Sequence, residues 1–251
     1  MPLAHDRTGS GPPLVLLHGL GSCKEMWRPL IPRLVREREV VAVDMPGFGA
    51  SPPGPRTVEE LAEALAEFVA GLGLERPAVA GNSLGGGVAL TMGAMGTAGS
   101  VCGVSPVGFV TRREGRYAQA VLVSTRALAE RLDPAADRLT RSAVLRTLLS
   151  AHVVARPWRI PAEDAAHWTR MYAQAPTFWD LVDALDEWRA PVPACPTTIA
   201  WGERDRLLIF SRQAPRARRA LPQARHVVLR GCGHIPTWDD PEQVARVLLS
   251  A

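Results

Sequence analysis

The sequence predicts an α/β protein in which helices flank a mostly parallel sheet and one helical segment is inserted between two strands. Short apolar runs alternate with helical patterns along most of the chain, which is typical of this fold class. The runs are apolar throughout, which favours strands buried on both faces of a parallel sheet. They are PLVLL ending at Leu17, EVVAVD ending at Asp44, PAVAG ending at Gly81, SVCGVS ending at Ser105, TTIAW ending at Trp201 and HVVL ending at Leu229.

Two helices of the predicted fold have clear start signals. TVEELAEALAEFVAGLGL begins with Thr57 and Glu60 in capping-box spacing, and its apolar residues recur at helical intervals. DDPEQV near the C-terminus places Asp240 as the N-cap and Pro241 at the first helical position. Both helices are expected to pack against the sheet.

The segment from Val107 to Ala190 interrupts the alternation, because it contains helical patterns and no comparable strand-like run. We predict that residues 107–190 form a helical cap and that residues 1–106 and 191–251 form the core domain. The cap crosses the carboxyl edge of the sheet in this arrangement. Its tryptophans are expected either to line a substrate pocket or to pack the insertion against itself. They are Trp158, Trp168, Trp179 and Trp188.

Composition excludes several function classes. The net charge is +4 over 251 residues, and the basic residues are dispersed without interleaved aromatics, so no nucleic-acid partner is expected. No apolar run approaches the roughly 20 residues needed to span a bilayer. The N-terminus lacks the pattern of a signal peptide, which favours a cytoplasmic protein. The four cysteines show no C-x-x-C spacing, and we expect reduced thiols rather than disulfides or a zinc site.

Ser83 is the predicted nucleophile. It follows the apolar run PAVAG and precedes the helical stretch LGGGVALTMGAM, in the pattern G-N-S-L-G. This pattern matches G-x-S-x-G, a sharp strand-to-helix turn that exposes the serine oxygen above the sheet. Glycines at 81 and 85 would let the strand and the helix approach each other.

A serine nucleophile needs a histidine base and an acid that orients the histidine. Asp205 and His234 each follow the end of a predicted strand, in the chain order Ser, Asp, His. Because the carboxyl ends of parallel strands share one edge of a sheet, the three side chains should converge. Asp239 and Asp240 are better explained as helix caps. Two insertion histidines are more consistent with surface or packing roles than with ligand roles, namely His152 and His167.

Backbone amides should complete the site, since attack on a carbonyl creates an oxyanion. An H-G turn follows the first buried strand in LLHGLGSC, and it would aim the amide of Leu20 toward the serine. The amide of Leu84 is the expected second donor, while the His18 side chain is expected to be structural.

These motifs together resemble the α/β-hydrolase family, in particular its capped serine hydrolases. The resemblance covers nearly the whole chain and rests on HGLGS, DMPGFGAS, GNSLGG, WGERD and GCGHIPTWDDPEQV, in that order. It implies acyl transfer to water with no cofactor and no metal ion. The serine also excludes the branches of the family that use an aspartate nucleophile.

The reaction expected from this resemblance is cleavage of a carboxylic ester through an acyl-enzyme intermediate. The expected partner is a small-molecule substrate with an apolar portion, while the oligomeric state is left open. Two alternatives stay open. The first is a carbon–carbon bond hydrolase, lactonase or biosynthetic enzyme on the same fold, and the second is a non-catalytic ligand-binding homologue.

Overall fold

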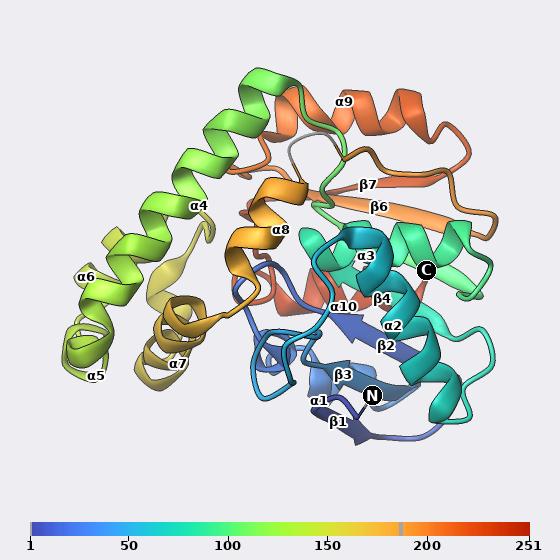
Figure 1. Cartoon of the computed structure of the whole chain (residues 1–251), viewed down its shortest axis with the longest axis horizontal. Coiled ribbons are helices and arrows are strands. Elements are labelled where there is room, and N and C mark those ends of the chain that lie inside the picture. Colours follow the sequence, from blue (N-terminus) through green and yellow to red (C-terminus); the bar gives the residue numbers. More distant parts are fainter. Residues whose placement is uncertain (1, 186–187) are drawn as a thin grey trace.

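The computed structural model describes residues 2–185 and 188–251, and within them seven strands form one sheet in the order β1-β3-β2-β4-β5-β6-β7 (Figure 1). Six of the strands are parallel, and β1 pairs antiparallel with β3 at the edge. The strands are β1 (His5–Thr8), β2 (Pro13–Leu17), β3 (Glu39–Val43), β4 (Ala78–Asn82), β5 (Ser100–Val104), β6 (Thr197–Gly202) and β7 (Arg225–Leu229). The predicted α/β fold class is confirmed.

Helices cover both faces of this sheet. Alternate residues of β2 enter two separate apolar clusters: Val15 and Leu17 pack with α2 and α3, whereas Leu14 and Leu16 pack with α1 and α10. This two-sided burial explains why the strands are apolar throughout. The helices of the sheet region are η1 (Lys24–Trp27), α1 (Ile31–Leu34), α2 (Val58–Gly71), α3 (Leu84–Ala94), α9 (Phe210–Ala220) and α10 (Pro241–Leu249).

The predicted helix starts are confirmed. The Thr57 hydroxyl accepts a hydrogen bond from the Glu60 amide, and the Glu60 carboxylate accepts one from the Thr57 amide, which completes the capping box of α2. Asp240 accepts a hydrogen bond from the amide of Gln243 at 2.9 Å and caps α10, with Pro241 at its first position.

The described residues between β5 and β6 form helices joined by loops and contain no strand, as the sequence predicts for this segment. Figure 1 shows α4, α5, α6 and α7 grouped at one end of the sheet, to the left of the strands in that view. The elements are α4 (Arg112–Leu132), η2 (Asp133–Ala135), α5 (Ala136–Leu139), α6 (Ala143–Ser150), η3 (Pro157–Arg159), α7 (Ala162–Gln174) and α8 (Phe178–Ala184). We refer to these helices as the inserted helices; the domain boundaries proposed from the sequence stay a prediction.

Among the described residues, no helix is both long enough and apolar enough to traverse a bilayer. All four cysteines lie within the described part of the chain and are free thiols.

Candidate active site

Ser83 occupies the tight turn between β4 and α3. Its backbone has φ 55° and ψ −114°, a region that costs a residue with a Cβ roughly 1–3 kcal/mol. Hydrogen bonds on both sides hold this conformation. The Ser83 amide donates to the carbonyl of Val104 at 3.0 Å, and its carbonyl accepts from the amides of Gly87 at 3.0 Å and Val107 at 3.2 Å. The turn is therefore fixed by the surrounding backbone rather than by the serine side chain.

Two glycines allow this turn because they permit close backbone approach. A Cβ atom at Gly81 would overlap the carbonyl oxygen of Gly85. A Cβ atom at Gly85 would overlap the carbonyl oxygens of Leu17 and His18, at the end of β2. The serine turn is thus in close contact with both α3 and the loop after β2, and only glycine fits at these two positions.

Asp205 and His234 lie side by side at the carboxyl ends of β6 and β7. The Asp205 Oδ2 atom is 2.8 Å from His234 Nδ1, and both side chains are buried. Asp205 Oδ1 accepts hydrogen bonds from the amides of Leu207 at 3.0 Å and Leu208 at 2.8 Å. Since a carboxylate can only accept, Nδ1 of His234 must carry the proton, which leaves Nε2 unprotonated in the neutral ring.

Asn82 joins the histidine loop to the serine turn. Its amide nitrogen donates to the carbonyl of His234 at 2.9 Å and to the carbonyl of Val104 at 3.1 Å. Val104 also accepts the hydrogen bond from Ser83, so the serine and the histidine are positioned by one buried network. Ser83 and His234 both line the same cavity. The structure thus pairs Asp205 with His234 and places His234 in the wall of the cavity that Ser83 also lines.

The loop after β2 lines the cavity beside the serine. His18 is buried; its Nε2 accepts a hydrogen bond from the Met45 amide at 3.0 Å, and its Nδ1 is 2.7 Å from the Gly19 carbonyl. Burial lowers the pKa of His18, which keeps the ring neutral and suits these structural bonds. Leu20 lines the cavity. Leu84 is the first residue of α3, so its amide has no acceptor within the helix.

The cavity extends from Ser83 and His234 along the inserted helix α4. Residues of α4 recur in its wall at intervals of three or four, which places them on one face of that helix. They are Gly115, Ala118, Gln119, Leu122, Thr125, Leu128, Ala129 and Leu132. Trp168 and Tyr172 of α7 complete part of the wall. The wall is mostly apolar, as is typical of small-molecule sites.

The four tryptophans proposed from the sequence lie in different environments. Trp168 lines the cavity and packs edge-on against Trp238. Trp158 and Trp179 are 54% and 47% exposed and lie outside the cavity wall. Trp188 is buried and donates a hydrogen bond from Nε1 to Glu59 on α2 at 2.7 Å. Of the four, we therefore retain Trp168 alone as a pocket residue.

His152, expected to have a surface or packing role, lines the cavity instead. Its Nε2 is 3.2 Å from the Thr125 hydroxyl, which itself donates to the Val121 carbonyl. Burial, and to a smaller extent the charge of His234, lowers the pKa of His152. No sequence signal marks this residue, because its contact depends on how α4 packs.

Asp239 does not cap the last helix, contrary to the interpretation of the sequence. Its side chain accepts hydrogen bonds from the amides of Gly233 at 2.8 Å, Ala155 at 3.0 Å and Arg156 at 2.6 Å. Asp240 alone caps the helix. Asp239 thus ties the inserted segment to the residue that precedes His234, a contact that short-range spacing does not reveal.

The family model described as "Alpha/beta hydrolase family" matches residues 14–247. The chain belongs to the alpha/beta hydrolase family. The match spans the serine turn, the inserted helices and the aspartate–histidine pair, so all of the site described above lies within the family region.

Similar proteins differ in how far the likeness extends. An uncharacterized protein of Mycobacterium tuberculosis is 28% identical, over 93% of this chain and 73% of its own length. A pimeloyl-[acyl-carrier protein] methyl ester esterase of Aeromonas hydrophila is 44% identical, over 36% of this chain and 35% of its own length. The solved esterase of Exiguobacterium antarcticum superimposes with a TM-score of 0.79 at 20% identity, over 99% of this chain and 94% of that one. The last likeness concerns the fold.

Proposed function

We propose that this protein is a serine hydrolase that cleaves a carboxylic ester through an acyl-enzyme intermediate. The observation that carries the proposal is the strained serine turn facing the same cavity as a buried histidine whose Nδ1 is 2.8 Å from a carboxylate. Strain of this kind persists where the surroundings enforce it, and it is concentrated at functional sites.

In the acylation step, Nε2 of His234 takes the proton of the Ser83 hydroxyl as its oxygen attacks the ester carbonyl carbon. Asp205 stabilises the resulting imidazolium and keeps the ring oriented. The amides of Leu20 and Leu84 hold the negative oxygen of the tetrahedral intermediate. The intermediate then collapses, the alcohol leaves with the proton from His234, and the acyl group stays on Ser83.

In the deacylation step, His234 takes a proton from water as that water attacks the acyl carbonyl carbon. The second tetrahedral intermediate uses the same two amides. Its collapse returns the proton from His234 to the Ser83 oxygen and releases the carboxylic acid. Every proton taken by the histidine is thus returned within one turnover, and no cofactor is required.

The apolar part of the ester is proposed to lie along α4. At about 1.5 Å per helical residue, the cavity face from Gly115 to Leu132 extends roughly 25 Å. Glycine and alanine at several positions of that face leave room beside the helix, whereas larger side chains would fill it. In this proposal residues 107–190 act as the cap over the core formed by residues 1–106 and 191–251.

The proposal is tested with p-nitrophenyl esters of increasing acyl length and the Ser83→Ala variant. Wild-type protein should release nitrophenol with saturating kinetics, and the variant should be slower by on the order of 10⁴-fold or more. The variant should keep its fold, because the turn is held by backbone hydrogen bonds. Far-UV circular dichroism serves as the control. Turnover by Ser83→Ala within tenfold of wild type would exclude the mechanism.

A further inference from the structure

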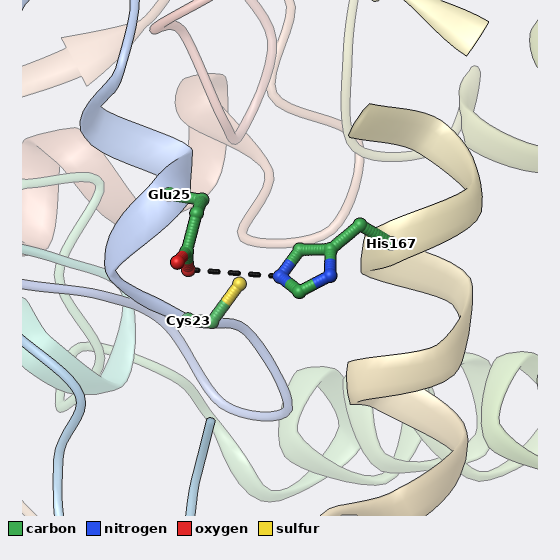
Figure 2. A group of neighbouring side chains, drawn as sticks. All are labelled: Cys23, Glu25 and His167. Carbon is green, nitrogen blue, oxygen red and sulfur yellow. Dashed lines mark ion pairs between the residues drawn. The ribbon is translucent and has the colours of Figure 1, made fainter. Parts of the chain in front are cut away.

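Three side chains outside the proposed catalytic residues form a second cluster of chemical interest. Cys23, Glu25 and His167 each offer one donor atom, and these atoms lie within 4.8 Å of one another. Figure 2 shows the three functional groups turned toward one another. Cys23 directly precedes η1, Glu25 lies within η1 and His167 lies on α7. The cluster therefore bridges the sheet region and the inserted helices.

The donor set suits a borderline-soft divalent cation. A thiolate, an imidazole and a carboxylate are all ligands of Zn²⁺, and a site with three protein ligands leaves a fourth position for water. The Nε2 atom of His167 is 3.6 Å from Oε2 of Glu25. Two such ligands on one tetrahedral zinc ion lie roughly 3.4 Å apart, given bond lengths of about 2.0–2.2 Å. These two donors would need to move very little.

The Nε2 atom of His167 forms no hydrogen bond within this cluster. The atom is buried and has no hydrogen-bond partner among the described residues, although the side chain as a whole is 38% exposed. A buried polar atom without a hydrogen bond costs about 1–3 kcal/mol, and the ion-pair contact of Nε2 with Oε2 of Glu25 (Figure 2), at 3.6 Å, is longer than a hydrogen bond. A metal ion at the centre of the cluster would remove that cost.

The surroundings of Glu25 favour its charged form. Burial opposes ionisation of Glu25, but hydrogen bonds from the Lys24 ammonium and the Cys23 thiol outweigh it and lower the pKa of Glu25 to about 2. The Lys24 ammonium bonds Oε1 of Glu25 at 2.9 Å and the carboxylate of Asp6 at 3.0 Å. Oxygen Oε2 of the same carboxylate faces His167, 3.6 Å from its Nε2 atom.

Cys23 would bind a metal ion as its thiolate. Burial first, and then the negative charges of Glu25 and Asp44, raise the pKa of its thiol. A bound divalent cation reverses this balance, because a coordinating thiol is deprotonated. Binding would thus release one proton from Cys23 as the sulfur–metal bond forms.

We propose that Cys23, Glu25 and His167 form a binding site for Zn²⁺ that joins the loop after β2 to α7. The residues next to the ligands in sequence line the catalytic cavity: Gly21 and Ser22 before Cys23, and Trp168 and Thr169 after His167. A bound ion would fix two walls of the cavity relative to each other. The sequence did not indicate this site, because its ligands come from distant segments.

The test begins with full-length protein freed of metal by dialysis against a chelator. Titration with Co²⁺, a spectroscopic substitute for Zn²⁺, should give one equivalent of binding and a thiolate-to-cobalt charge-transfer band. Zn²⁺ should displace the Co²⁺ and abolish the band. Zn²⁺ should also raise the Tm of the wild-type protein in proportion to the logarithm of its concentration.

Variants at the ligands locate the site. Cys23→Ser should abolish the charge-transfer band, and Glu25→Gln and His167→Gln should each weaken Co²⁺ binding by at least about tenfold, the loss caused even by changes next to ligands. Cys195→Ser and His226→Gln are the matched controls and should bind as the wild type does. His167 is partly exposed, so His167→Gln should fold normally, which circular dichroism checks.

Absence of the charge-transfer band in the wild-type protein would overturn the proposal, as would equal Co²⁺ affinity in wild type and His167→Gln. Either result would reduce the cluster to a polar contact between η1 and α7. Because metal binding and Tm are measured without substrate, the outcome is independent of whether Ser83 acts as a nucleophile.

Discussion

The serine turn and the inserted helices are stabilised in different ways. In α3, which follows Ser83, residues from Leu84 through Gly93 are all buried, and three of the first four are glycines that allow close backbone contact. In α6 no residue is buried, and Val144 and Leu148 are 69% and 72% exposed. The turn is thus determined by backbone packing, whereas the inserted helices shape the cavity with side chains on one face. Chemistry and substrate selection are therefore expected to respond to different kinds of mutation.

The largest effect is expected at the carboxylate of Asp205, which bonds Nδ1 of His234. Asp205→Asn should lower kcat by roughly 10³–10⁴-fold, because an amide in place of the carboxylate favours the wrong histidine tautomer. Asp240→Asn, which changes a helix cap, is the matched control and should leave kcat unchanged. Steady-state kinetics with a p-nitrophenyl ester measure both. A kcat for Asp205→Asn close to that of wild type would assign the acid role to another residue.

The next effect concerns stability at the turn. Gly85→Ala should lower the free energy of unfolding by about 3 kcal/mol or more, because the new Cβ atom meets two backbone oxygens that cannot move cheaply. For a chain of this size, that loss corresponds to a Tm lower by roughly 6–12 °C. Gly71→Ala is the control, since a Cβ atom at the end of α2 meets nothing within 4 Å. Calorimetric Tm values that agree for the two variants would contradict the role given to backbone packing.

A smaller effect is expected in the inserted helices. Trp168→Leu should change the ratio of kcat/KM between short and long acyl esters by about tenfold, because a change in pocket volume alters the binding of apolar groups by about 1–3 kcal/mol. Trp179→Leu, at an exposed position on α8, should leave that ratio unchanged. If both variants lose Tm and keep the wild-type ratio, Trp168 serves packing and not selection.

The smallest expected effect is a pH dependence of stability from His152. Its pKa is lower in the folded protein than its ordinary value of 6.5, so below that value the unfolded chain binds more protons. Stability should therefore fall as the pH decreases from about 7.5 to about 5.5, and it should fall less in His152→Gln. His18, whose pKa burial also lowers, contributes equally to both proteins. Tm measured across this range gives the difference, and equal slopes would exclude the assignment.

The elements that the sequence predicts correctly are those that depend on local patterns. Buried parallel strands, the capping box at Thr57 and the strand ends that carry Ser83, Asp205 and His234 depend on local patterns, and these elements lie where the sequence predicts them. The strand β1 was not predicted, because His5–Thr8 is short and polar and pairs only at the sheet edge. The catalytic roles of the three residues stay a prediction.

Contacts between distant segments account for what the sequence could not predict. Asp239 neighbours a helix start and so fits a capping pattern, but its bonds reach the amides of Ala155 and Arg156. The cavity face of α4 depends on the rotation of that helix against α7, which the amphipathic pattern alone does not specify. Contacts between distant segments also decide which tryptophans line the cavity, so the sequence could not distinguish Trp168 from Trp158.

Ser83 is proposed to carry the acyl group during turnover. The most direct measurement is mass spectrometry of protein quenched by acid within the first turnovers of a p-nitrophenyl ester, followed by peptide mapping. We expect one acyl group per chain, on the peptide that contains Ser83, with loss of that adduct in Ser83→Ala. Hydrolysis without any acylated peptide, or an adduct on another residue with Ser83 unmodified, would contradict it.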